Sequence, residues 1–273
     1  MQPVLSSCRV GGHALTYRRA GGGDPVVLVH GFLAHSFVWE GVLQRLAPRY
    51  DVTAIDLLGC GGSDKPVDVD LGVAAHAARL LAFLDALGIE RAHLVGHGLG
   101  GAMVLLAGAQ APSRVRTLTA VNVAGYGQGA TPLVRLFAWR HLPGSGLAVL
   151  RALGPLLVRR RFGPGAHVHE GLVEAFTAPY PDRKTLASLQ RFARDVAGRD
   201  ELSAGRHALC HLTVPTTLVW GMNDHFRSFH AAERLHQDIP GARLVRIPGA
   251  GHLVQLQEPQ ALTEVLVQAF RRA

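Results

Sequence analysis

Cysteine and lysine are both scarce in this chain. It has three cysteines among 273 residues, Cys8, Cys60 and Cys210, and two lysines, Lys65 and Lys184. An odd number of cysteines without the spacing of a metal site argues against a disulfide framework and favours a reducing compartment, so we expect a cytoplasmic protein. No apolar run approaches the ~20 residues that a membrane-spanning helix needs, and the N-terminus lacks the features of a signal peptide. We therefore expect neither a membrane span nor export.

Acidic residues are absent from a long central stretch. None occurs between Glu90 and Glu170, although this stretch contains the run Arg159–Arg161, and the formal charge of the whole chain is +8. A basic excess is typical of proteins that bind nucleic acids or acidic membranes, but the arginines are scattered and no nucleic-acid-binding motif accompanies them. We expect no nucleic-acid partner and interpret the run as a solvated helix face, while an anionic substrate or a membrane-facing surface stays open.

Hydrophobic residues make up 48% of the chain, which is enough for a sizeable core. Short apolar or β-branched runs predict buried strands at 26–29, 52–55, 93–95, 115–121, 216–220 and 244–247. Three-and-four spacing of apolar residues predicts helices at 74–87, 99–110 and 261–270. Because strands and helices alternate, we expect an α/β fold with a mostly parallel central sheet and helices on both faces.

The alternation fails between residues 126 and 212, where glycine and proline separate short helical pieces. These pieces are predicted at 132–141, 147–160 and 182–196. We expect residues 1–125 and 213–273 to form the α/β core and residues 126–212 to form a helical cap inserted into it.

One Gly-rich segment, residues 93–101, follows a predicted strand and begins a predicted helix. Gly96, Gly98 and Gly101 match the G-x-G-x-x-G fingerprint of dinucleotide-binding sites. That fingerprint expects an acidic residue roughly 20 positions later, which the acid-free stretch does not supply, and it usually opens its domain. The same segment matches a G-x-S-x-G nucleophile elbow in which glycine replaces serine. We favour the elbow and expect no cofactor.

Four further motifs accompany the elbow. They are His30-Gly31-Phe32 after a strand, the loop Asp56–Pro66, the segment Trp220–Asp224 and the segment Gly249–His252. Together these motifs resemble the α/β-hydrolase superfamily over essentially the whole chain. The resemblance implies an α/β-hydrolase fold, a catalytic histidine at His252 oriented by the carboxylate of Asp224, and an oxyanion hole formed by the backbone N–H groups of Phe32 and Leu99.

The sequence departs from the superfamily at the position of the nucleophile. Gly98 cannot attack a substrate, which excludes a covalent intermediate at this position. Three hypotheses remain. In the first, His252 and Asp224 act directly as a general acid and base on a small hydrophobic, carbonyl-bearing substrate, as in a lyase, isomerase or cyclase. In the second, an ester or C–C bond hydrolase has had its nucleophilic serine exchanged for glycine. In the third, the protein binds a small molecule without catalysis.

Other polar and aromatic residues have weaker assignments. Five are candidates for contacts with the substrate, namely His30, Trp39, Trp139, Phe176 and Tyr180. We expect His97 to pack beneath the elbow, and Asn122, at the end of a strand, to serve only as a hydrogen-bonding group. The pairs His167/His169 and His207/His211 have spacings compatible with a metal, but they lie away from the expected centre, so we predict no metal site. The partner is then a small-molecule substrate, and a homodimer is left open.

Overall fold

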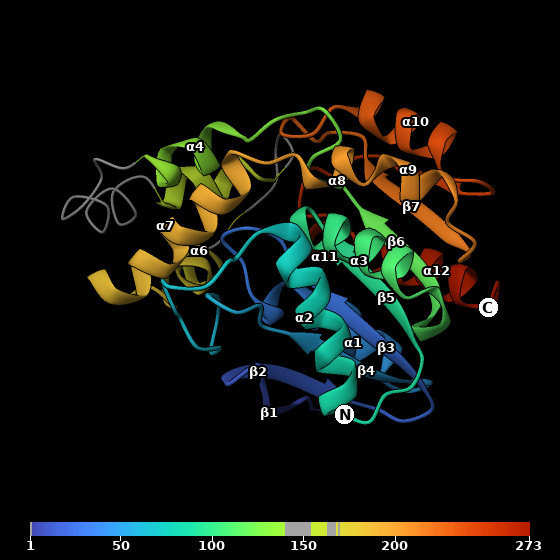
Figure 1. Ribbon diagram of the computed structural model, residues 1–273, viewed down its shortest axis with the longest axis horizontal. Coiled ribbons are helices and arrows are strands. Elements are labelled where there is room, and N and C mark those ends of the chain that lie inside the picture. The colour runs from blue at the N-terminus through green and yellow to red at the C-terminus, as the bar shows by residue number, and fades with distance from the viewer. Residues whose placement is uncertain (1, 140–153, 163–167, 169) are drawn as a thin grey trace.

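The central sheet dominates the structure. The computed structural model describes residues 2–139, 154–162, 168 and 170–273, and among them eight strands form one sheet (Figure 1). The strand order is β1-β2-β4-β3-β5-β6-β7-β8. The strands are Val4–Val10 (β1), His13–Ala20 (β2), Asp24–Val29 (β3), Tyr50–Ile55 (β4), Ala92–His97 (β5), Val115–Val121 (β6), Thr216–Gly221 (β7) and Arg243–Ile247 (β8). Strands β3 to β8 are parallel, which confirms the mostly parallel sheet and all six predicted strands.

Strands β1 and β2 were not predicted. They form an antiparallel hairpin in which Val10 pairs with His13 across the loop Gly11-Gly12. Both glycines have positive φ angles, 57° and 85°. A two-residue loop of this kind matches the twist of the flanking strands, and glycine adopts it without steric cost. The Gly-Gly pair was therefore the sequence feature that marked this hairpin.

Helices cover both faces of the sheet, as predicted. Helices α2 (Val73–Ala86) and α3 (Leu99–Gln110) share one buried cluster with the sheet, and α1 (Glu40–Leu46) and α12 (Pro259–Phe270) share another. Figure 1 shows α2 and α3 side by side on the near face. Residues 100–108 of α3 are all buried, and a helix that is apolar all round packs on every side. The packing of α3 therefore fixes its position directly after the turn that connects it to β5.

The described residues between β6 and β7 contain helices and no strand. These helices are α4 (Pro132–Ala138), α6 (Glu170–Thr177), α7 (Arg183–Ala197), α8 (Glu201–Ala204) and α9 (Arg206–Cys210), and residues 154–159 are also helical. Helix α4 packs against α7, whereas α8 packs on α2 and α9 on α3 (Figure 1). The last part of the predicted cap therefore lies on the helices of the core. Residues 140–141 and 147–153 of the predicted helical pieces lie outside the described residues.

Short elements complete the fold. They are the 3₁₀ turns η1 (Ser36–Trp39) and η2 (Pro112–Arg114) and the helices α10 (Phe229–Asp238) and α11 (Val254–Gln257). None of the helices in the described part of the chain is long and apolar enough to cross a membrane.

We predict that Gly96→Ala destabilises the protein by about 3 kcal/mol, because a methyl group there has no room. Its Cβ would lie 2.1 Å from the carbonyl oxygen of Gly100, inside the first turn of α3. The free energy of unfolding, measured by urea denaturation, checks this. Gly22→Ala is the matched control because a Cβ on Gly22 meets nothing within 4 Å, and we expect it to change stability by less than about 0.5 kcal/mol. Equal stabilities of the two variants would contradict the prediction.

Candidate active site

Five residues of interest follow the carboxyl ends of parallel strands. His30 follows β3, Gly98 follows β5, Asn122 follows β6, and Asp224 and His252 lie in the loops after β7 and β8. Because these strands are parallel, their carboxyl ends meet at one edge of the sheet, where ligands bind in open α/β sheets. The topology alone therefore brings together residues that are far apart in the sequence.

Gly98 forms the sharp turn between β5 and α3. Its φ and ψ angles are 58° and −118°, a conformation that glycine adopts without strain and that costs a residue with a Cβ ~1–3 kcal/mol. The turn is tight because α3 starts directly against the sheet. A Cβ on Gly100 would lie 2.4 Å from the carbonyl oxygen of Val29. The backbone therefore has the geometry of the predicted elbow, without its nucleophilic side chain.

Asp224 is held by four hydrogen bonds. Its Oδ1 accepts from the backbone N–H groups of Phe226 and Arg227, at 2.7 and 3.0 Å. Its Oδ2 accepts from Nδ2 of Asn122 and from Nδ1 of His252. Burial alone would raise the pKa of Asp224, but His252 and these hydrogen bonds outweigh it and lower the pKa to about 2. Asp224 is ionised and its orientation is fixed.

Asn122 positions Asp224 through both ends of its amide. The backbone N–H of Gly221 donates to Oδ1 of Asn122 at 3.0 Å. Because that N–H group can only donate, the amide must turn its Nδ2 towards Asp224. The predicted hydrogen-bonding role of Asn122 thus has a specific target, the acid after β7.

His252 donates from Nδ1 to Oδ2 of Asp224 at 2.8 Å, which leaves Nε2 free to accept a proton. Burial lowers the pKa of His252 below 6.5; the carboxylate of Asp224 opposes this shift, and the charges of Arg161 and Arg227 add to it. The imidazole is therefore neutral at neutral pH. Its Nε2 faces Gly98, because a Cβ built on Gly98 would lie 3.9 Å from it.

Two other histidines support the turns of the site. His97 is buried and bonds through Nε2 to the carbonyl oxygen of His252 at 2.9 Å, so it packs beneath the elbow. His30 accepts from the backbone N–H of Leu57 through Nε2, so its Nδ1 carries the proton and donates to Gly31. Burial lowers the pKa of His30 to about 4, which keeps it neutral. His30 fixes the loop that carries Phe32.

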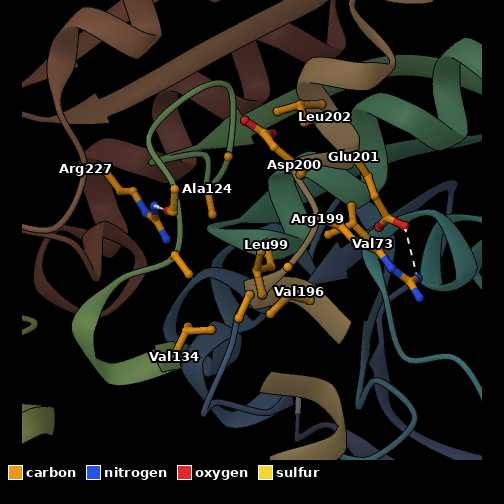
Figure 2. A pocket seen from close by; sticks show the side chains of 16 residues that line it. Val73, Leu99, Ala124, Val134, Val196, Arg199, Asp200, Glu201, Leu202 and Arg227 are labelled. Atoms are coloured by element: carbon orange, nitrogen blue, oxygen red, sulfur yellow. Dashed lines mark hydrogen bonds and ion pairs between the residues drawn. The ribbon is translucent and has the colours of Figure 1, made fainter. Parts of the chain in front are cut away.

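A small cavity of about 30 Å³ lies at Gly98 and His252. Phe32 and Leu99 also line it, and neither of their backbone N–H groups donates to another described residue. A neighbouring cavity of about 270 Å³ shares with it the residues Leu99, Ala124, Val134 and Arg227 (Figure 2). The small cavity borders the imidazole, and the larger one beside it has space for a small molecule. The larger cavity is lined by apolar side chains and by the charged residues Arg199, Asp200, Glu201 and Arg227.

The five predicted substrate contacts do not line either cavity. His30 and Trp39 are buried in the core, and Phe176 packs edge-on against Phe37 with ring centres 4.8 Å apart. Tyr180 is buried beside Cys60, and Trp139 is 58% exposed. Aromatic composition did not distinguish residues that fill the core from residues that line a cavity.

Two arginines at the cavities were not among the predicted site residues. Arg161 and Arg227 both line the small cavity, and Arg227 also lines the larger one. Arg161 belongs to the run interpreted as a solvated helix face. Arg159 fits that interpretation because it pairs with Glu170 at the surface, but Arg161 is only 6% exposed. Arg227 lies three residues after Asp224, and nothing in the local sequence marked it.

The histidine pairs with metal-compatible spacing form no recognisable metal site among the described residues. His207 and His211 stack with ring centres 4.6 Å apart. No group of three or more potential ligands, however, occurs in the part of the chain that the structure describes. His167 and His169 lie outside that part.

The protein is similar to known proteins both in sequence and in structure. The sequence matches the family described as alpha/beta hydrolase fold over residues 24–144 and 175–259. It is 30% identical to an uncharacterized protein of Mycobacterium tuberculosis, over 97% of this chain and 80% of that protein. It is 28% identical to the uncharacterized hydrolase YugF of Bacillus subtilis, over 89% and 88%. The structure is similar to an alpha/beta hydrolase fold protein from Burkholderia ambifaria, with a TM-score of 0.86, 28% identity and coverage of 96% and 97%.

We predict that Asp224 makes stability depend on pH at the acidic end. The pKa of Asp224 is 3.8 in the unfolded chain and about 2 in the folded protein. Its ionised form therefore contributes about 2 kcal/mol to the free energy of unfolding. This contribution is present above pH 3.8 and is lost as the pH falls through about 2. Urea denaturation of the wild type and of Asp224→Asn along this range checks it. The difference between their free energies of unfolding should shrink as the pH falls, and a constant difference would contradict the prediction.

Proposed function

Because the chain belongs to the alpha/beta hydrolase fold family, we propose that it is a cofactor-independent enzyme in which His252 acts as a general acid and base. The substrate is a small, hydrophobic, carbonyl-bearing molecule. One observation carries the proposal: the pair Asp224–His252, joined at 2.8 Å, directs its free Nε2 at a residue that has no side chain. The base therefore faces the substrate instead of a nucleophile.

The proposed reaction moves one proton through His252. Its neutral Nε2 takes a proton from the carbon next to the substrate carbonyl, and Asp224 stabilises the imidazolium that forms. The electron pair left on carbon moves to the carbonyl oxygen, which accepts hydrogen bonds from the backbone N–H groups of Phe32 and Leu99. Return of the proton to another atom of the enolate completes an isomerisation. In a lyase step the carbonyl re-forms while the bond to a leaving group two carbons from the carbonyl carbon breaks, and the imidazolium gives the proton to that group. In a cyclase step the carbon bonds to an electrophilic carbon of the same molecule, and the imidazolium protonates the atom that takes up the displaced electron pair. No covalent intermediate forms at Gly98.

A second function is favoured by the space at Gly98. A Cβ there would lie 3.8 Å from Cα of Gly31 and 3.9 Å from Nε2 of His252, both ordinary contacts. A hydroxyl one bond further lies within hydrogen-bond reach of Nε2. The site thus retains the space of a serine-type ester or C–C bond hydrolase in which glycine stands in place of the nucleophile.

We predict that His252→Ala slows proton exchange at the carbon next to the carbonyl of small ketones and β-keto acids, measured in D₂O by ¹H NMR. Loss of the base should reduce the rate by about 10²–10⁴-fold. Asp224→Asn should reduce it too, because the imidazole loses its orientation. His207→Ala is the control, since this histidine lies on α9 and lines neither cavity. Undiminished exchange in His252→Ala would refute the proposal, and ligand binding with no exchange in any variant would indicate a binding protein.

We predict that Gly98→Ser becomes labelled by a fluorophosphonate and gives a burst of p-nitrophenol from activated esters, since His252 and Asp224 are in place to activate the hydroxyl. Gly98→Ala is the matched control, because it adds the same Cβ without the hydroxyl. Both variants should lose ~1–3 kcal/mol of stability to backbone strain. A folded Gly98→Ser that stays unlabelled would contradict the second function.

A further inference from the structure

Arg227 is a buried cation with few partners. The residue is 7% exposed, and its Nε is buried without a hydrogen-bond partner among the described residues. Its Nη1 makes one long contact, 3.4 Å to the carbonyl oxygen of Gly129, and no described residue accepts from its Nη2. A guanidinium usually binds a carboxylate through two N–H groups on one edge. In Arg227 the edge formed by Nε and Nη2 is unused by the described residues.

The nearest acids do not neutralise Arg227. Asp224 and Asp200 both interact with its charge, but neither makes an ion pair with it in the described part of the chain. Asp224 already accepts four hydrogen bonds at its two oxygens. Asp200 accepts from the backbone N–H groups of Tyr126 and Gly127 and from Ser203. Both carboxylates are held by other donors, so Arg227 has no ion-pair partner among the described residues.

Arg161 places a second buried cation at the same site. It is 6% exposed and donates to the carbonyl oxygens of Phe32 and Leu33, at 2.9 and 3.1 Å, instead of to a carboxylate. Burial and then the charge of Arg227 lower the pKa of Arg161 to about 10. Both arginines line the small cavity that contains Gly98 and His252. Two like charges buried beside a cavity favour an anion between them.

We propose that Arg227, supported by Arg161, binds the carboxylate of an organic acid, so that the substrate carries a carboxylate in addition to its reacting carbonyl. This assignment rests on the proposed function for the reaction, but the binding site stands on its own geometry. The walls around Arg227 argue for an organic acid instead of an inorganic ion. Leu99, Val134 and Val196 lie between Arg227 and the Arg199–Glu201 pair in the larger cavity, where they would contact hydrocarbon (Figure 2).

Binding to the wild-type protein is the first test. Isothermal titration calorimetry with phenylacetate, with its neutral isostere phenylacetamide and with inorganic phosphate compares the three ligand types directly. We expect phenylacetate to bind about tenfold or more tightly than phenylacetamide, because a hydrogen-bonded charge pair is lost with the amide. Equal binding of acid and amide, no binding of the acid, or tighter binding of phosphate would overturn the proposal without requiring any variant.

Variants then locate the site. Arg227→Met should weaken phenylacetate binding to that of the amide, and it should raise the melting temperature of the free protein because a buried charge without an ion-pair partner is removed. Arg227→Lys keeps the charge and should bind the acid with intermediate affinity. Arg199→Gln is the matched control, because Arg199 lines the same larger cavity but is 47% exposed and paired with Asp70. Unchanged acid binding in Arg227→Met, or equal losses in Arg227→Met and Arg199→Gln, would overturn the proposal.

The same titration, together with the exchange assay, distinguishes a failure of the anion site from a failure of the proposed catalysis. His252→Ala should still bind phenylacetate, since the arginines and the apolar walls are unchanged. Acid-selective binding without proton exchange in the wild type would refute the catalytic proposal alone. Proton exchange without acid-selective binding would refute the anion site alone.

Discussion

The turn between β5 and α3 is the constraint on which the site depends. Gly96 and Gly100 allow α3 to start directly against the sheet, and Gly98 takes a backbone conformation that a side chain would strain. This places the N–H of Leu99 and the imidazole of His252 around one small space. Because residue 98 is a glycine, the site has neither a nucleophilic side chain nor the backbone strain that a side chain would cause there. The backbone geometry is kept because the buried strand β5 and the buried residues 100–108 of α3 enforce it.

Burial and the surrounding charges together set the pKa of the His252 imidazole. Asp224, fixed by Asn122 and two backbone N–H groups, stabilises the protonated ring. Burial and the charges of Arg161 and Arg227 favour the neutral ring. The imidazole is therefore neutral at neutral pH, and the proposed proton transfer requires a neutral ring that can be protonated briefly. The same two arginines form the proposed anion site, so the pKa of His252 and the proposed choice of substrate depend on the same residues.

The sequence predicted those parts of the protein whose determinants are local. Five of the six parallel strands, all but β8, contain a run of four or more buried residues. The motifs around Gly98, Asp224 and His252 each lie within a few residues of one strand end. The hairpin β1–β2 was missed although Gly11-Gly12 marked it, because its half-exposed strands lack a continuous apolar run. The aromatic residues expected at the substrate lie outside both cavities, since composition does not show which side of a helix meets the core.

The sequence by itself determined that no nucleophile stands at residue 98, because a glycine has no side chain in any fold. It also determined the alternation of strands and helices, which specifies a parallel sheet and a common edge for the strand ends. Only the tertiary structure decided that Arg161 and Arg227 meet beside His252. One lies before β7 and the other after it, and the burial of a charge depends on what packs around it, which no local pattern of residues expresses.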